Sequence, residues 1–353
     1  MPLLARTVLA PLAVEVRRGA LGGLGDILTD RRISAGGEVA VVVGPGLGTE
    51  VSELVRDRLH RAEILTVTGG TFAAAAELAA KLRVGEYDAV VGIGGGRTID
   101  TVKYAATQQG LPMVSVATSL AHDGIASPVS VLDRDGVSVS YGVHTPLAVV
   151  VDLDFVRRSP SWQTRSGIGD ALSNLSATAD WQLAHKARGE PIDGLALALA
   201  RTGAEAVLSH PGDIGDDDFL ATLANALVLG GVAMAVAGSS LPCSGGCHEI
   251  AHAITKLYPG VGTHGQQVGL GALFCTYLRG DTGPFARLAA ALLRHGLPRT
   301  PAELGLTDEQ FVEAVTHAPA TRPGRYTILE HLALSPDQIA GKLAGFLCAV
   351  ARS

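Results

Sequence analysis

The chain has few cysteines, few lysines among its 28 basic residues and no long apolar run. Its four cysteines are too few and too irregularly spaced for the disulfide framework of a small secreted domain, so reduced thiols are expected. No stretch approaches 18 consecutive apolar residues, so a membrane span is not expected. The opening MPLLARTVLAPLAVEVRR is broken at Arg6, Pro11 and Glu15 and lacks a small-residue cleavage site. We therefore expect a soluble, cytoplasmic protein.

Positive charge is also scarce. The 28 basic residues face 34 acidic ones, which gives a net charge of −6 without a concentrated basic patch, so nucleic-acid binding is not expected. Apolar residues make up 47% and charged residues 18% of the chain, a balance that supports large cores and excludes long disorder. The length of 353 residues predicts two packed units.

The two halves of the sequence differ in pattern. The first 150 residues alternate β-branched runs with helical segments, which is typical of a parallel sheet with crossover helices, and the continuous apolar runs predict strands buried on both faces. After about Phe155 long helical windows predict an all-helical half. We therefore predict an α/β nucleotide-binding domain over residues 1–156 and an all-α domain over 157–353, with a ligand cleft where they meet. The predicted strands are VAVVVG (39–44), AEILTVTG (62–69), YDAVVGIGG (87–95), PMVSVAT (112–118) and LAVVVDL (147–153).

Two loops that follow predicted strands are candidates for cofactor binding. Gly94, Gly95 and Gly96 precede a helical segment, and bare backbone amides at a helix start can hold a diphosphate with about 0.3–1 kcal/mol per anionic contact. A merely structural turn is the alternative, and a further glycine-rich stretch lies at 44–48. The loop ATSLAHDGIASP (117–128) offers short polar side chains at a strand end where α/β sheets bind ligands. Its alternative is a turn capped by Asp123 and Ser127.

The helical half carries a set of possible metal ligands. They are Asp170 in GIGDALSN, His248 and His252 in SGGCHEIAHAI, and His264 in GTHGQQVG. Two imidazoles and a carboxylate suit Zn²⁺ or Fe²⁺ with positions left open for substrate and water. The alternative for any one of these histidines is a structural role.

A competing motif overlaps this set. Residues 248–252 read HEIAH, a literal HExxH, which would place two zinc ligands one turn apart with Glu249 as the base of a peptidase. The extended motif fails because Thr255 and Tyr258 stand where it requires glycine and a third histidine. A peptidase would also leave the glycine turn without a function. The cysteines just before His248 have no second pair to complete a structural zinc site.

Five segments together resemble, in order and spacing, the motifs of sn-glycerol-1-phosphate dehydrogenases. This family belongs to the superfamily of iron-containing alcohol dehydrogenases, glycerol dehydrogenase and 3-dehydroquinate synthase. The resemblance covers roughly residues 14–280 and implies a dehydroquinate synthase-like fold, with an amino-terminal nucleotide domain and a helical metal domain. The segments are GIGGGRTIDTVKYAA, TSLAHDGIASPVSVL, DLDFVRRSPSWQTRSGIGDALSNLSATADWQLA, SGGCHEIAHAI and THGQQVGLG.

Applied residue by residue, the resemblance implies specific functions for these segments. It implies one divalent metal held by Asp170, His248 and His264, with Asp123 and His252 contacting substrate. It also implies NAD or NADP as cofactor. The implied cofactor-binding residues are Gly94, Gly95, Gly96, Arg97, Thr98 and Asp100 at the diphosphate, and Thr118, Ser119, Leu120, Ala121 and Ser127 beside the nicotinamide.

The chain departs from the family pattern at three places. SGGCH (244–248) stands where the family reads SGSEH or SGAEH, HGQQVG (264–269) where it reads HGEQVG, and TSLA (118–121) where it reads TxxS. These changes leave open the same chemistry on a different secondary alcohol in specialised metabolism. A lyase like 3-dehydroquinate synthase is a further alternative, although the scarcity of lysine argues against its phosphate chemistry.

The sequence therefore predicts a metal-dependent, NAD(P)-dependent dehydrogenase that transfers hydride between nicotinamide and a secondary alcohol or ketone, similar to glycerol-1-phosphate dehydrogenase. Zinc is the expected metal, and iron also fits. His252 or His122 is expected to relay the proton. Arg97, Arg165 and Lys256 are the cations nearest the motifs in sequence, but none can be assigned to a substrate phosphate. We expect a small-molecule substrate and a homo-oligomer.

Overall fold

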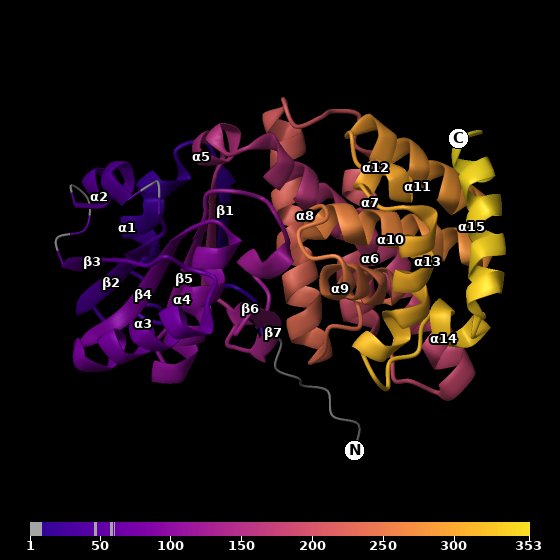
Figure 1. Cartoon of the computed structure of the whole chain (residues 1–353). Helices are drawn as coiled ribbons and strands as arrows, with labels where there is room; N and C mark the ends of the chain where they lie inside the picture. Colours follow the sequence, from indigo (N-terminus) through magenta and orange to yellow (C-terminus); the bar gives the residue numbers. More distant parts are fainter. Residues whose placement is uncertain (1–8, 46–47, 57–58, 60) are drawn as a thin grey trace, which may run out of the picture. The chain divides into compact units, whose positions relative to one another are not determined.

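The chain folds into two compact units, which divide after Pro160 (Figure 1). The computed structural model describes residues 9–45, 48–56, 59 and 61–353. The sequence placed the domain boundary after residue 156, whereas α5 (Leu153–Arg158) still belongs to the first unit. Residues 46–47 of the glycine-rich stretch at 44–48 and residues 1–8 of the opening segment lie outside the described residues.

The first unit is built on a six-stranded sheet whose pairings are all parallel, in the order β1-β8-β5-β4-β2-β3. All five strands predicted from the sequence are present. The sequence missed a sixth strand, β1, which pairs with β8 at one edge of the sheet. The strands are β1 (Ala13–Arg17), β2 (Glu38–Val43), β3 (Ala62–Thr66), β4 (Tyr87–Gly94), β5 (Met113–Ala117) and β8 (Ala148–Asp152).

Burial of the strands follows their place in the sheet. Every residue of β5 and β8 is buried, as the continuous apolar runs predicted. The same prediction is wrong for β3, which is only partly buried because it forms an edge. The other edge strand, β1, reads AVEVR and leaves Val14 exposed. Its mixed polar pattern explains why the sequence did not reveal it.

Helices cover both faces of this sheet, as in other α/β folds. Val41, Val91 and Val150 point to one face, where Val51 of α2 completes the core. Helix α4 packs on the opposite face. Gly92 of β4 lies so close to Val102 of α4 that an added side chain at Gly92 would contact it. The helical elements of this unit are η1 (Ala20–Gly23), α1 (Leu24–Ile27), α2 (Gly48–Arg56), α3 (Phe72–Val84), α4 (Gly96–Gln109), η2 (Asp123–Ile125) and α5.

A two-stranded antiparallel hairpin, β6 (Val129–Arg134) and β7 (Val137–Gly142), lies beside α4 and was missed by the sequence analysis. Its turn residues Asp135 and Gly136 have φ angles of 58° and 81°. Asp-Gly is a strong signal for such a turn, because both positions need a positive φ. The hairpin also contacts α4 through Asp100, whose carboxylate accepts a hydrogen bond from the Val131 amide at 3.3 Å.

The second unit is entirely helical, which confirms the prediction for this half. Among the described residues, only α8 is long and apolar enough to cross a membrane. However, 67% of its most apolar window is buried inside the structure, and it packs along α7 as a core helix does. The elements are α6 (Ser161–Arg188), α7 (Gly194–Ser209), α8 (Asp217–Ala237), α9 (Gly246–Leu257), α10 (His264–Arg279), α11 (Thr282–Arg294), α12 (Pro301–Leu304), α13 (Asp308–His317), η3 (Ala318–Thr321), α14 (Ile328–Leu332) and α15 (Pro336–Val350).

A buried histidine makes the stability of this unit depend on pH. His295 stacks on Phe219 with ring centroids 4.8 Å apart, and burial together with Arg294 lowers its pKa to about 4. In the unfolded chain the His295 imidazole takes up a proton near pH 6.5, whereas in the folded protein it does so only near pH 4. The free energy of unfolding therefore falls as the pH drops from 6.5 towards 4. We expect His295 to contribute a loss of about 2 kcal/mol in unfolding free energy between pH 7 and pH 5.

Urea unfolding at the two pH values tests this, with His295→Phe as the comparison because phenylalanine keeps the stacked ring without a titratable nitrogen. The variant should lose less stability than the wild type on acidification. Identical losses in the two proteins would contradict the assignment.

Candidate metal centre and cofactor-binding turn

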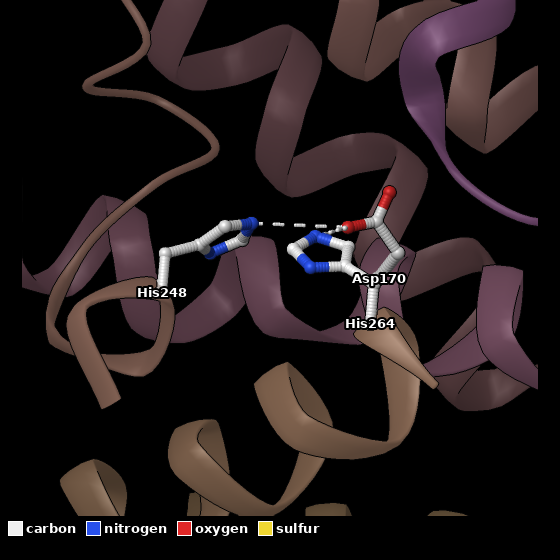
Figure 2. A group of neighbouring side chains, drawn as sticks. All are labelled: Asp170, His248 and His264. Carbon is white, nitrogen blue, oxygen red and sulfur yellow. Dashed lines mark ion pairs between the residues drawn. The ribbon is translucent and has the colours of Figure 1, made fainter. Parts of the chain in front are cut away.

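Asp170, His248 and His264 converge in the second unit (Figure 2). They come from α6, α9 and the first turn of α10. One ligand atom of each lies within 4.8 Å of the others. The Nε2 atoms of His264 and His248 lie 3.4 and 3.8 Å from Asp170 Oδ1. The structure therefore brings together the three residues that the family resemblance implied, and His252 is not a member of the group.

Two glycines allow α6 and α10 to approach closely beside these ligands. A side chain at Gly265 would overlap the carbonyl oxygen of Ser166, and one at Gly169 would overlap the carbonyl oxygen of Gly265. The Gly265 amide also donates a hydrogen bond to Ser166 Oγ at 3.0 Å. Since Gly169 precedes Asp170 and Gly265 follows His264, the backbone contact sets the separation of these two ligands.

The start of α9, which carries His248, is held by a buried carboxylate. Asp180 of α6 accepts a hydrogen bond from the Gly246 amide at 2.9 Å. It also forms a 2.7 Å ion pair with Arg279 of α10 and accepts the Ile328 amide at 3.0 Å. Asp180 thereby joins three helices and the start of α14. The sequence analysis did not identify Asp180, because a single aspartate within a long helix has no distinguishing sequence pattern.

Cys247, which stands where the family has a carboxylate, faces α6. Its thiol lies 3.8 Å from the Ser173 carbonyl oxygen, and burial followed by the charge of Asp180 raises its pKa to about 12. Cys243 donates instead to the Gly230 carbonyl oxygen at 3.3 Å. No cysteine belongs to a potential metal-binding group in the described part of the chain. The structure thus gives no support to a cysteine zinc site, and the departure at Cys247 leaves the donor set unchanged.

The environments of His248 and His252 favour the neutral imidazole. Burial, then the neighbouring His264, lowers the pKa of His248 well below its ordinary value. Burial and Arg322 lower the pKa of His252 to about 3. An Arg322 guanidinium nitrogen lies 3.0 Å from His252 Nε2. A guanidinium only donates, so Nε2 accepts and Nδ1 carries the proton. The sequence analysis missed Arg322, which lies 70 residues after His252 in the segment ATRPGRY.

The glutamate of the HExxH motif is turned away from a catalytic position. Glu249 is fully buried, and its Oε2 accepts a hydrogen bond from Thr327 Oγ1 at 3.0 Å. Burial and the charge of Glu330 raise its pKa to about 8. A peptidase would need this carboxylate at a metal-bound water and would need His252 as a ligand. The geometry supports neither requirement.

We expect Glu249→Gln to leave metal content and catalytic rate within about twofold of the wild type, because an amide matches the neutral acid in shape and charge. Metal analysis and steady-state kinetics on the purified variant check this. A loss of activity with the fold intact would mean that Glu249 acts on the substrate, as in a peptidase.

The glycine turn of the first unit lies at a reversal in strand order. The chain runs from β2 to β3 in one direction and from β4 to β5 in the other, and ligands of open α/β sheets bind outside such reversals. A side chain at Gly94 would come within 2.7 Å of Thr98, and one at Gly95 within 3.1 Å of Ser119. One at Gly96 would overlap the ring of His122. Crowding around the turn therefore favours glycine at positions 94 and 96, whereas a side chain at position 95 would need only a small shift of the Ser119 hydroxyl.

The 117–128 loop lies directly beside this turn, because the Thr118 amide donates to the Gly94 carbonyl oxygen at 3.1 Å. His122 caps η2, with its Nδ1 accepting the Gly124 amide at 3.0 Å. The His122 side chain thus caps η2, a role that the sequence analysis did not assign to it. The parts of the turn and loop that reach solvent are Gly95, Gly96, Arg97, Ala121, His122 and Asp123, whereas Thr118, Ser119 and Leu120 are buried.

Asp100 and Ser127 lie behind the turn in a buried polar cluster. Lys103, which has no exposed side-chain surface, forms a 3.0 Å ion pair with Asp100. It also donates to the carbonyl and hydroxyl oxygens of Ser127 at 3.2 and 3.4 Å. Asp100 and Ser127 therefore join α4 to the loop. The sequence predicted both as cofactor contacts and did not identify Lys103, which connects them.

Comparison with known proteins places the chain among dehydrogenases. The sequence model described as iron-containing alcohol dehydrogenase matches residues 15–160. The chain is 37% identical to a glycerol-1-phosphate dehydrogenase (NAD(P)+) of Methanospirillum hungatei, over 91% of this chain and 89% of that protein. It is 36% identical to the enzyme of that name from Hyperthermus butylicus, over 90% of this chain and 92% of the relative.

Solved structures share the whole fold at lower identity. A probable glycerol dehydrogenase from Sinorhizobium meliloti superposes with a TM-score of 0.79 at 21% identity, over 99% of both chains. Glycerol dehydrogenase from Schizosaccharomyces pombe gives a TM-score of 0.78 at 21% identity, over 99% of this chain and 92% of that one. These two show the fold, and the sequence relatives show that the chain belongs to the glycerol-1-phosphate dehydrogenase family of iron-containing alcohol dehydrogenases.

Proposed function

We propose that this protein is an NAD(P)-dependent dehydrogenase that interconverts glycerol 1-phosphate and dihydroxyacetone phosphate and uses one divalent metal ion. The observation that carries the proposal is the convergence of Asp170, His248 and His264 within 4.8 Å in a member of this family. Their helices, α6, α9 and α10, place a carboxylate and two imidazoles at one point of the helical unit. The names of the relatives and this set of donors support the same reaction for this chain.

The donor set fits a catalytic metal. Three protein ligands leave coordination positions open, and two histidines with a carboxylate form a known catalytic zinc set that also suits Fe(II). The low pKa of His248 keeps its nitrogen unprotonated, as metal binding requires. We propose zinc as the ion. When bound, it would supply a Lewis acid that polarises the ketone oxygen.

The glycine turn is the proposed site of the cofactor diphosphate. Gly95 caps the 14-residue helix α4 without a side chain, and Gly96 begins it. Both residues are partly exposed, and their amides lie at the positive end of the helix. Lys103, Asp100 and Ser127 would hold the neighbouring nicotinamide loop against α4 from behind. When bound, the reduced nicotinamide cofactor would supply the hydride for ketone reduction, and its oxidised form would accept the hydride in alcohol oxidation.

Three further side chains are proposed to contact substrate. His252 offers its Nδ1–H as a hydrogen-bond donor, because Arg322 occupies Nε2. Asp123 offers a carboxylate acceptor for a substrate hydroxyl. His122, whose Nδ1 already accepts from Gly124, has its proton on Nε2 when neutral and is the second candidate for proton relay.

The experiment is a reductase assay on the metal-loaded enzyme with dihydroxyacetone phosphate and either NADH or NADPH, followed by the loss of reduced-nicotinamide absorbance. We expect net cofactor oxidation, a loss of at least about 100-fold on chelator treatment and recovery with Zn²⁺. Product without net cofactor change would indicate the lyase. Turnover only with other secondary ketones would indicate a changed substrate.

A further inference from the structure

Two arginines near His252 have no carboxylate partner. Arg322 and Arg325 lie between η3 and α14, and neither forms an ion pair in the described part of the chain. Arg322 donates to His252 Nε2 at 3.0 Å. Arg325 donates to the Ser244 carbonyl oxygen and, at 3.0 Å, to Ser240 Oγ. Both are partly buried. Cations withdrawn from water without a counter-charge are costly, so such a pair indicates an anion that the structure does not itself supply.

The surrounding groups do not neutralise this charge. Burial lowers the pKa of both guanidinium groups, and Arg322 lowers that of Arg325 further, so the two are close enough to repel. The acid on the adjacent helix, Glu249, is hydrogen-bonded to Thr327. The other groups that face the pair are Asp180, which is paired with Arg279, the Cys247 thiol, and the imidazoles of His248 and His252; none of them forms an ion pair with either arginine in the described part of the chain. The pair is thus a positive site beside the metal-binding group.

The position of the pair relates it to the substrate. The ring centroid of His252 lies 6.4 Å from that of His248, a member of the metal-binding group, and its Nε2 lies 3.0 Å from an Arg322 guanidinium nitrogen. One side chain, His252, therefore links the guanidinium to the metal-binding group. In dihydroxyacetone phosphate a single CH₂–O link separates the phosphate from the reacting carbonyl, so both groups fall within one short stretch of the site.

The other cations considered from the sequence form no hydrogen bond with His252 in the described part of the chain. Arg165 donates to the His295 carbonyl oxygen, and Lys256 lies 3.1 Å from His317 Nε2. Arg97 belongs to the first unit. The Arg322 guanidinium is bonded to His252 instead, and it retains donors in the planar arrangement that matches phosphate oxygens.

We propose that Arg322 binds the phosphate group of the substrate, with Arg325 supplying the second positive charge, and that this pair selects a phosphorylated ketone over an unphosphorylated one. This inference rests on the proposed dehydrogenase function. The two hydrogen bonds of Arg325 hold the 322–327 segment against the 240–244 turn, which leads into α9 and its proposed metal ligand His248. The proposed phosphate site is thereby linked to one of the three helices that carry the metal ligands.

The test compares the metal-loaded wild type with Arg322→Gln. The ratio of kcat/KM for dihydroxyacetone phosphate to that for dihydroxyacetone should fall about 10- to 100-fold, the effect of losing charge-assisted hydrogen bonds. Binding of inorganic phosphate, measured by calorimetry, should weaken similarly. Arg322→Lys should recover part of both. Arg287→Gln is the matched control, since Arg287 pairs with Glu205 on the surface of the same unit.

The outcomes separate this inference from the proposed function. A folded, metal-loaded Arg322→Gln enzyme with an unchanged substrate ratio and unchanged phosphate binding would overturn the inference and leave the dehydrogenase intact. A raised KM for NADPH alone would assign the arginine to the cofactor and would also overturn it. Absence of turnover in the wild type would instead contradict the proposed function. If Arg322→Gln does not fold, an unchanged ratio in Arg325→Gln would refute the paired site.

Discussion

Asp170→Asn is expected to remove the bound metal and reduce kcat/KM by more than about 100-fold. Mutating a residue that only hydrogen-bonds to a metal ligand already lowers metal affinity or activity by up to about that factor. Asparagine keeps the shape of the side chain but replaces the anionic oxygen that lies 3.4 Å from His264 and 3.8 Å from His248. Metal content per chain, measured on protein purified without chelator, should fall from about one ion to less than about a tenth, with helical content unchanged.

Glu249→Gln is the matched control, because it makes the same acid-to-amide change one residue from His248. Full metal occupancy in Asp170→Asn would refute the proposed ligand set. His252→Gln provides a second check, since this residue lies outside the group. It should retain the ion and lose turnover, whereas an HExxH site would lose the ion.

Gly265→Ala is expected to lower the free energy of unfolding by about 3 kcal/mol and to weaken metal binding at least tenfold. The added methyl group would overlap the Ser166 carbonyl oxygen, which belongs to a helix backbone and cannot rotate away. Helix α10 has little room to retreat, because Gly271 packs against α9 and a side chain there would lie 2.7 Å from the Cys247 carbonyl oxygen. Separating α6 from α10 would move His264 away from Asp170.

Gly341→Ala in α15 is the control for this substitution. Gly341 is exposed in the helix interior and has nothing within 4 Å of an added methyl group. Alanine there should raise stability by about 0.5–1 kcal/mol. Urea unfolding and chelator competition for the metal measure both effects. Equal stability in the two variants would show that the backbone contact between α6 and α10 is not tight.

The sequence identified the residues that could bind the metal, but their pattern did not show which of them form the metal-binding group. The residues alone left four candidates, Asp170, His248, His252 and His264, and a literal HExxH that favoured a different pair. Only the family resemblance separated them. In the structure, the selection follows from the packing of α6, α9 and α10, which leaves His252 in contact with Arg322.

Local pattern by itself determined the alternation of strands and helices, the all-helical second half and the position of the glycine turn. Apolar periodicity and glycine content act over a few residues and can be read directly. Tertiary structure alone decided that Ser127 faces Lys103, that Glu249 faces Thr327 and that Arg322 reaches His252. The physical reason is that the last two contacts join residues 78 and 70 positions apart, and packing, which no local pattern records, brings them together.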